Sequence, residues 1–327
     1  MIKGRKLKVF ITGVSGFVGP HLLQELLQAG HEVWGVSRAD KPGGAHKLFE
    51  NHLFLELKNE PEIAEAIAHA EPDVIIHLAA QSNPALSWEM PLDTFDSNVG
   101  MTVSLLRGMQ QRPGTRFYFI SSSDVYGRPP EETLPVTEAH PLMPDNPYAV
   151  SKVAAEHCAR LYGEKFGIQV GIIRPFSHTG PGQTSRFVVP AFARQIAEIE
   201  AGLREKLIHG DLSTFRDFTD VRDIVRAYRL IVEHESCLPV VNVCSGMTIE
   251  IQHILDQLIS MSNTTIHAEF DRSKKRGEFR TPLRGTYKLL QCATGWQPIL
   301  KMDETLQDVL QEQRKQVGAL LAGGNTK

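Results

Sequence analysis

The first half of the chain alternates short, almost uninterrupted apolar runs with longer segments whose apolar residues recur every three or four positions. The apolar runs predict strands; they occupy residues 7–12, 31–37, 52–57, 73–80, 116–122 and 169–175. The segments with the longer period predict helices; they occupy residues 19–30, 60–70, 91–111 and 147–167. Strands that are apolar on both faces and alternate with helices are typical of a parallel sheet with helices on both sides. The pattern therefore predicts an α/β fold.

Beyond residue 175 this rhythm changes. Glycine, proline and serine dominate residues 177–186, an amphipathic helix is predicted at 221–234, and a buried strand is predicted at 239–246. We therefore predict a doubly wound parallel sheet followed by a smaller C-terminal α/β lobe. The first domain comprises residues 1–175, with 217–246 returning to it, and the lobe comprises 176–216 and 247–327.

Composition narrows the class of protein. Hydrophobic residues make up 42% of the 327 positions and charged residues 22%, as in an ordinary globular protein. The net charge of −3 provides no basic field for nucleic acid or for an anionic membrane. No apolar run is long enough to span a bilayer, and the N-terminus is typical of a first strand and not of a signal peptide. The four cysteines form no CxxC pair, so we predict no metal site and a cytoplasmic location.

A glycine-rich loop follows the first predicted strand. The stretch "ITGVSGFVG" places Gly13, Gly16 and Gly19 between this strand and the first helix. Glycines permit a tight turn and close backbone approach, and a helix that begins near Phe17 and Val18 presents amide donors to a pyrophosphate. Because the motif stands between a strand and a helix, it favours a Rossmann-type dinucleotide site over a purely structural turn.

The end of the second strand bears on the choice of nucleotide. An acidic residue there would hold the ribose 2′-hydroxyl of NAD, but this chain has Ser37 and Arg38. A hydroxyl and a guanidinium suit a 2′-phosphate, so we expect NADP, although Arg38 could also be a solvated surface residue. His77 is interpreted as a packed strand residue. The ends of the next two strands are expected to line the adenine and nicotinamide-ribose sides of the cofactor: Glu56, Leu57, Leu78, Ala79 and Ala80.

A tyrosine and a lysine stand four residues apart on a predicted helix. Tyr148 and Lys152 therefore share one face, and a nearby ammonium is expected to lower the pKa of the phenol so that it can transfer a proton near neutral pH. Ser122, at the end of the preceding strand, could polarise a substrate carbonyl, with Ser121 or Ser123 as substitutes. Taken alone, this YxxxK spacing is also common on ordinary helix surfaces.

Four ordered motifs carry a family resemblance. TGxxGFxG, HLAA, SSxxVYG and YxxxK resemble, over nearly the whole chain, the nucleotide-sugar branch of the extended short-chain dehydrogenase/reductase family. "RPFSHTGPGQ", "RDFTDVRD" and "NVCSG" are similar to the group of GDP-mannose 4,6-dehydratases and GDP-4-keto-6-deoxy-mannose reductases, and more so to the reductases. The resemblance implies a GDP-linked sugar as partner, NADP as cofactor, and a homodimer that pairs through the predicted helices 91–111 and 147–167.

The resemblance also implies substrate contacts. They are Ser123, Ser177, His178, Val188, Arg216 and Arg276. Ser177 stands where the family usually has asparagine, and residues 274–285 follow the family pattern only loosely. Arg216 could instead form an ion pair with Asp217 that fixes a loop.

Asp124 bears on the choice between two reactions. A 4-ketoreductase needs only Ser122, Tyr148 and Lys152, whereas a 4,6-dehydratase also needs an acid or base for water elimination. In the dehydratases that this chain resembles, the segment at this position is similar to "STSELYG". Its glutamate, at the position of Asp124, has a side chain that reaches about 1.5 Å further. The reductases resemble "SSGDVYG", and Asp124 could also simply cap the following turn.

We therefore expect NADPH-dependent reduction of the C4 ketone of a GDP-4-keto-6-deoxy-hexose to a GDP-6-deoxy-hexose of the GDP-rhamnose type, for polysaccharide biosynthesis. The alternatives are a GDP-mannose or GDP-heptose 4,6-dehydratase, a nucleotide-sugar 4-epimerase, and a non-catalytic subunit that binds NADP or a nucleotide sugar.

Overall fold

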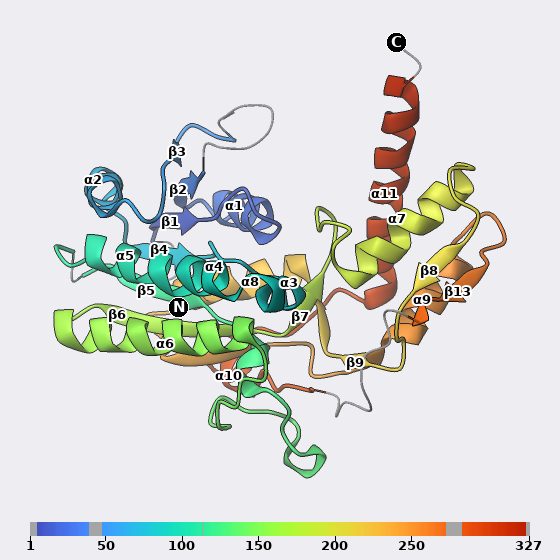
Figure 1. Cartoon of the computed structure of the whole chain (residues 1–327). Helices are drawn as coiled ribbons and strands as arrows, with labels where there is room; N and C mark the ends of the chain where they lie inside the picture. Colours follow the sequence, from blue (N-terminus) through green and yellow to red (C-terminus); the bar gives the residue numbers. More distant parts are fainter. Residues whose placement is uncertain (1–4, 39–47, 113, 273–282, 325–327) are drawn as a thin grey trace.

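A seven-stranded parallel sheet forms the centre of the protein (Figure 1). The computed structural model describes residues 5–38, 48–112, 114–272 and 283–324. The strands lie in the order β11-β6-β5-β4-β1-β2-β3. Their bounds are β1 Lys8–Thr12, β2 Glu32–Ser37, β3 His52–Phe54, β4 Val74–His77, β5 Arg116–Ile120, β6 Gln169–Pro175 and β11 Val240–Val243. The predicted α/β fold with a doubly wound parallel sheet is confirmed.

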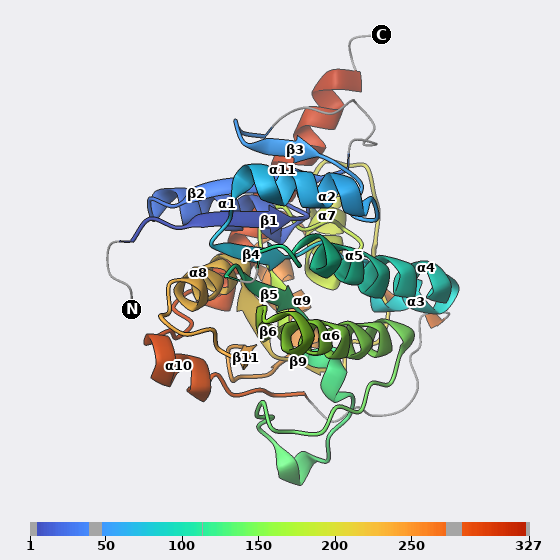
Figure 2. The same cartoon turned by 90° about the vertical axis from the view of Figure 1, so that its left-hand side faces the viewer.

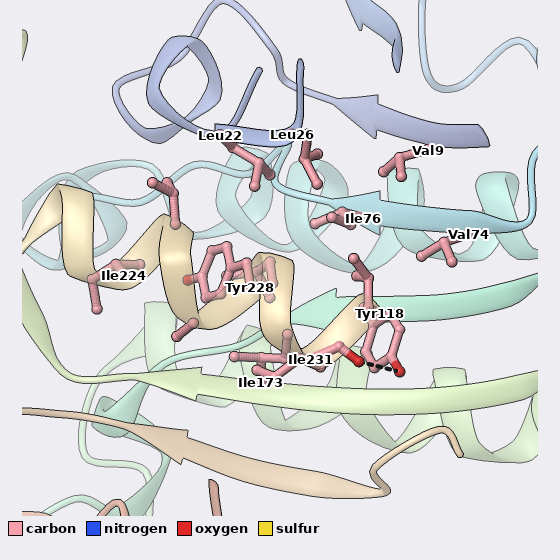
Figure 3. Packing of buried hydrophobic residues seen from close by; sticks show 14 of the residues in the cluster. Val9, Leu22, Leu26, Val74, Ile76, Tyr118, Ile173, Ile224, Tyr228 and Ile231 are labelled. Carbon is pink, nitrogen blue, oxygen red and sulfur yellow. Dashed lines mark hydrogen bonds between the residues drawn. The ribbon is translucent and has the colours of Figure 1, made fainter. Parts of the chain in front are cut away.

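Helices cover both faces of this sheet. One face packs against α1 (Val18–Gln28) and α8 (Val221–Val232), with α10 (Lys288–Thr294) beside them. Figure 3 shows this layer, in which Leu22 and Leu26 of α1 and Tyr228 of α8 point at the strands. The other face packs against α2 (Glu60–Ala70), α5 (Met101–Gly108) and α6 (Pro147–Phe166). The two-sided burial explains why the strands read as continuous apolar runs.

The helix predicted at 91–111 is interrupted. α4 (Pro91–Phe95) and α5 are joined by a π-helix, η1 (Asp96–Gly100), and the short helix α3 (Pro84–Glu89) precedes them. The helix expected around residues 91–111 is therefore present, with a π-helical turn in its middle. A π-turn inserts one extra residue per turn, and such insertions are frequent at functional sites.

The second lobe is built around three helices with a separate apolar core. α7 (Val188–Glu200), α9 (Ile251–Ser260) and α11 (Met302–Gly324) enclose it, and the far end of α11 projects from the body (Figure 1). Two-stranded sheets β10-β7, β12-β9 and β13-β8 border these helices. The strands are β7 Ser177–Thr179, β8 Leu207–His209, β9 Phe215–Arg216, β10 Phe218–Asp220, β12 Ile249–Glu250 and β13 Ala268–Phe270.

Hydrogen bonds tie the lobe to the sheet at the start of α8. The carboxylate of Asp220 accepts from the Arg222 amide at 2.7 Å, which caps the helix, and from the Thr305 hydroxyl of α11 at 2.6 Å. On the other side, the His21 imidazole of α1 bonds the Pro181 carbonyl at 2.8 Å, and Glu312 of α11 accepts from the Gly182 amide at 2.7 Å. The loop after β7 is thus held between α1 and α11.

Candidate active site

The glycine-rich loop between β1 and α1 is compact enough to admit no side chain at two positions. Gly13 has φ +74°, and a Cβ there would lie 2.8 Å from the Ala79 amide nitrogen at the end of β4. A Cβ on Gly19 would lie 2.2 Å from the Val14 carbonyl oxygen. The N-terminus of α1, at Phe17, has no side-chain cap. A tight glycine cradle at an uncapped helix N-terminus fits a pyrophosphate, which accepts from such amides.

The ends of the neighbouring strands border this loop. Ser37 is buried at the end of β2, and its hydroxyl bonds the His52 imidazole at 2.8 Å, while Arg38 beyond it is exposed. Glu56 is exposed and Leu57 is buried in the sheet core, so only the backbone of Leu57 could meet a cofactor.

The segment after β4 is fixed by its backbone. Leu78, Ala79 and Ala80 are partly exposed, and the Leu78 amide donates to the Thr12 carbonyl at 3.2 Å. His77 is buried between the hydroxyls of Thr12, at 2.6 Å, and Thr102, at 3.1 Å. Burial, followed by the charge of Lys152, lowers the pKa of His77 to about 3, so this imidazole is neutral and structural.

The three serines after β5 have different environments. Ser121 is buried and donates to the Glu156 carboxylate at 2.6 Å, and Ser123 is buried as well. Ser122 is half-buried, its hydroxyl accepts from the Asp124 amide at 3.1 Å, and its side chain hydrogen-bonds the phenol of Tyr148. Ser122 is therefore the serine that shares a site with Tyr148. Its hydroxyl, and not the carboxyl of Asp124, caps the short 3-10 helix η2 (Ser123–Tyr126).

Tyr148 and Lys152 lie on the first turns of α6. Asn146 caps this helix by accepting from the Ala149 amide at 2.9 Å, and Pro147 occupies the first helical position, so the sequence fixes where α6 begins. The Lys152 ammonium is buried, donates to the Ile120 carbonyl at 2.8 Å, and lies 5.9 Å from the centroid of the Tyr148 ring.

Burial dominates the protonation of both groups. It raises the pKa of Tyr148, the charge of Asp124 raises it further, and only the hydrogen bond with Ser122 opposes this. Burial also lowers the pKa of Lys152 to about 7, against the attraction of Glu156. The expectation that Lys152 lowers the pKa of Tyr148 is therefore wrong for the chain by itself. At neutral pH the phenol keeps its proton and is a potential proton donor.

Asp124 interacts electrostatically with Arg216 and with Tyr148. Burial raises the pKa of its carboxyl, and the Arg216 guanidinium of β9 lowers it less strongly. The Asp124 charge in turn acts on Tyr148. Ser122, Asp124, Tyr148 and Arg216 thus lie together, although they come from three different elements.

Asp217 has a role separate from that of Arg216. It accepts hydrogen bonds from the Ser245 hydroxyl at 2.6 Å, from the Ser245 amide at 2.8 Å and from the Gly246 and Gly285 amides at 3.1 Å each. Its carboxylate therefore fixes loops that are distant in sequence.

The remaining expected substrate contacts lie at the border between the lobes. Ser177 is half-buried on β7, and Val188 is the first residue of α7. The His178 ring stacks on Phe17 of the glycine-rich loop, with centroids 6.0 Å apart and planes at 7°, and its Nδ1 bonds the Phe176 carbonyl at 2.9 Å. Burial lowers the pKa of His178, so it is neutral. Arg276 lies outside the described residues.

The sequence did not indicate Asn98, in the π-helix. Its side-chain nitrogen donates to the Ser151 hydroxyl at 2.9 Å and to the Gln81 carbonyl at 3.1 Å, and its oxygen accepts from the Gln81 amide at 2.8 Å. Because Ser151 stands between Tyr148 and Lys152, Asn98 fixes α6 relative to the loop after β4.

A buried ion pair under the site was also missed. Glu156, one turn after Lys152, binds the Arg174 guanidinium of β6 through contacts of 2.9 and 2.6 Å. Arg174 also donates to the Tyr126 hydroxyl at 3.0 Å, and Tyr126 donates to the Asn242 side chain at 2.7 Å. The network joins η2, β6, β11 and α6. Charged residues within apolar segments were its only signal in the sequence.

Two features are not found in the part of the chain that the structure describes. None of its helices combines the length and the apolar character that crossing a membrane requires. Among the same residues, no three or more histidine, cysteine, aspartate or glutamate side chains gather where they could hold a metal ion.

This chain is similar to several known proteins. The family model described as GDP-mannose 4,6 dehydratase matches residues 10–309. GDP-6-deoxy-D-mannose reductase of Pseudomonas aeruginosa is 36% identical over 95% of this chain and 98% of its own. GDP-mannose 4,6-dehydratase of Yersinia enterocolitica is 31% identical over 70% of this chain and 65% of its own.

A solved structure extends this similarity to the fold. The structure of RMD from Pseudomonas aeruginosa complexed with NADPH has a TM-score of 0.83 and 32% identity, and covers 95% of this chain and 100% of that one. The match with the family model and the near-complete coverage at more than 30% identity establish the assignment. The chain belongs to the GDP-mannose 4,6-dehydratase family, in the nucleotide-sugar branch of the short-chain dehydrogenases/reductases.

Proposed function

We propose that the protein reduces the C4 ketone of a GDP-4-keto-6-deoxy-hexose with NADPH, giving a GDP-6-deoxy-hexose of the GDP-rhamnose type for polysaccharide biosynthesis. One observation carries the proposal. Tyr148 is buried, protonated and hydrogen-bonded to Ser122, with a short acid, Asp124, beside it. Similarity to a curated reductase over 98% of that protein supports the same reaction.

Each residue of the site has its own role in the proposed reaction. NADPH, when bound, supplies the hydride that reaches C4. Ser122 hydrogen-bonds the C4 carbonyl oxygen, and Tyr148 donates its phenolic proton to the same oxygen as negative charge develops there. The Ile120 carbonyl holds Lys152 in place. From there its ammonium would stabilise the tyrosinate that remains and would hold the ribose of a bound cofactor. The charge of Asp124 raises the pKa of the phenol and so favours its protonated form until a substrate oxygen accepts the proton.

The first domain binds the cofactor and the second lobe binds the nucleotide sugar. Residues 1–175 with 217–246 hold the cofactor: the glycine-rich loop takes the pyrophosphate, Ser37 and Arg38 take the 2′-phosphate, and the ends of β3 and β4 border the adenine and the ribose. Residues 176–216 and 247–327 hold the nucleotide sugar, with Ser177, His178, Val188 and Arg216 lining the pocket. The stack of Phe17 on His178 supports this division, because it brings the cofactor loop into contact with the sugar lobe.

A second candidate is a 4,6-dehydratase acting on a GDP-hexose. The observation that favours it is the half-buried Asp124 side chain beside Tyr148, because the raised pKa of the Asp124 carboxyl suits a proton-transfer group. Against it stands the reach of the side chain, about one carbon–carbon bond shorter than that of glutamate, since a displacement of this size can cost a large factor in rate.

Two assays separate these reactions. In the first, the purified protein with an added oxidised cofactor is incubated with GDP-mannose alone, and formation of a 4-keto sugar is followed. In the second, it receives the GDP-4-keto-6-deoxy sugar and NADPH, and absorbance at the reduced-nicotinamide band is followed. We expect consumption of NADPH in the second assay only. Keto-sugar formation in the first assay would instead assign the dehydratase, and inactivity in both would assign a binding subunit.

We further propose a homodimer that works in the cytoplasm. α4–α5 and α6 run side by side (Figures 1 and 2) and expose apolar side chains: Leu92 is 83% exposed, Leu161 64% and Val150 40%. Exposed apolar residues that gather on one face mark protein interfaces. Four unpaired cysteines are consistent with a reducing compartment.

A further inference from the structure

Beside the carboxyl end of β2, the first residue of β3 is a buried histidine, His52, that no other role accounts for. In the parallel pair of β2 and β3, Gly35 is opposite His52 and Ser37 is opposite Phe54. Because Gly35 has no side chain, the Phe49 ring fits against it; a Cβ there would lie 2.7 Å from that ring. His52 lies between two aromatic rings, stacked on Phe49 with centroids 5.6 Å apart and planes at 8°, and 4.6 Å from Phe54.

The hydrogen bonds of His52 determine its tautomer. The Leu48 amide donates to Nδ1 at 3.0 Å, so Nδ1 is the acceptor. In a neutral imidazole the proton then lies on Nε2, which is 2.8 Å from the Ser37 hydroxyl oxygen and must donate to it. Ser37 therefore accepts from His52, and its own proton is directed at another group. None of the described residues accepts that proton, and the hydroxyl lies at the strand end that borders the cofactor loop.

We infer that His52 is a positioning residue that makes Ser37 an obligatory hydrogen-bond donor to the 2′-phosphate of NADP, and so contributes to the choice of NADP over NAD. The inference rests on the proposed cofactor. A donor aimed at this point is satisfied by a phosphate oxygen, which only accepts. Without the histidine, the hydroxyl could rotate and be satisfied elsewhere. Because Phe49 and Phe54 hold the ring, the donor is oriented before the cofactor arrives, and little entropy is lost on binding.

The test measures binding and not turnover. Isothermal titration calorimetry measures the dissociation constants for 2′,5′-ADP and for 5′-AMP. The constant for 5′-AMP divided by that for 2′,5′-ADP gives the preference for the 2′-phosphate. We expect Ser37→Ala to reduce this ratio by at least about tenfold, because a hydrogen bond to a charged group is lost. We expect His52→Phe, which keeps the aromatic packing, to reduce it by about fivefold, and His52→Gln, whose amide can donate from nearly the same place, to restore most of it.

The double variant decides whether the histidine acts through the serine. If it does, Ser37→Ala with His52→Phe has the same ratio as Ser37→Ala alone, because the two residues form one unit. A purely structural histidine would weaken 2′,5′-ADP and 5′-AMP equally, so the ratio would not move.

His31 provides a matched control. It is also buried, its Nδ1 accepts from the Leu7 amide at 3.2 Å, and its Nε2 contacts Glu233 at 3.0 Å, but it lies before the first residue of β2, at the opposite end of that strand. His31→Phe should lower the melting temperature, because its hydrogen bonds are lost, and should leave the ratio of the two dissociation constants unchanged. A wild-type protein that fails to distinguish the two ligands refutes both the NADP preference and this inference. A normal wild-type ratio that persists in His52→Phe refutes the inference alone.

Discussion

Replacing Lys152 with methionine should abolish reduction and make the protein more stable. Lys152 is 3% exposed, and burial lowers its pKa from 10.5 to about 7. At pH 7 and below, charging this ammonium in the folded state therefore costs about 5 kcal/mol relative to the unfolded chain. Methionine keeps most of the side-chain volume but loses the hydrogen bond to the Ile120 carbonyl, which offsets about 2 kcal/mol. The net gain is about 3 kcal/mol.

The gain should depend on pH in a defined direction. Between about pH 7 and 10.5, the folded lysine is neutral while the unfolded one still binds its proton, so the wild-type protein becomes more stable as pH rises through this window. The methionine variant lacks this contribution. The difference in stability between the two proteins should therefore be largest near pH 7 and shrink toward pH 10.

Thermal melting followed by circular dichroism measures this difference. For a chain of this size, about 3 kcal/mol corresponds to a rise of about 6 °C in the melting temperature at pH 7. Lys165→Met on the same helix is the control, because Lys165 is exposed and its loss should shift stability by less than about 0.5 kcal/mol. A Lys152→Met protein that melts at or below the wild-type temperature at pH 7 would refute the claim that burial of the charge is the dominant effect.

Three further outcomes follow from the site and the surface. Tyr148→Phe should lower kcat for ketone reduction by at least about a hundredfold while the dissociation constant for NADPH, measured by fluorescence, stays within about twofold. Ser121→Ala should destabilise the protein by about 1 kcal/mol and keep its activity, because Ser121 donates a hydrogen bond to Glu156. Ser122→Ala should keep the melting temperature and lose activity, because Ser122 contacts Tyr148; thermal melting and an activity assay measure both variants. Leu161→Asp should halve the light-scattering mass of the proposed homodimer; a variant that keeps the dimer mass would place the interface elsewhere, and a wild-type protein with the mass of one chain would refute the homodimer.

Much of the fold could be predicted because its signals are local. Each predicted strand of the first half coincides with an observed one to within a few residues, and Asn146 with Pro147 marks the start of α6 through cap chemistry that depends only on neighbours. The π-helix at Asp96–Gly100 could not be predicted in this way. It places Asn98 between Gln81 and Ser151, which are distant in sequence and meet only after the sheet has formed.

The site illustrates the same limit for electrostatics. The spacing of Tyr148 and Lys152 correctly suggested one helix face, but the direction of the phenol's pKa depends on burial, which spacing does not reveal. Likewise, the sequence favoured Ser122 by its place after the strand but could not show why Ser121 and Ser123 are unsuitable. The Glu156 carboxylate binds Ser121, and Glu156 is itself in place because Arg174 of β6 pairs with it inside the core. The choice of Ser122 is thus made by a buried ion pair from two other elements.

The motif "RDFTDVRD" shows that a family resemblance can mark architecture as well as chemistry. Its three aspartates are buried and each binds partners that are distant in sequence: Asp217 fixes the loops at Ser245 and Gly285, Asp220 binds α11, and Asp223 accepts from the amides of Ile299 and Leu300. Such bonds satisfy carboxylates that would otherwise be costly to bury. Because these aspartates join the second lobe to the sheet, substitutions at them should disturb the position of that lobe, whereas a substitution of Arg216 acts directly beside Asp124.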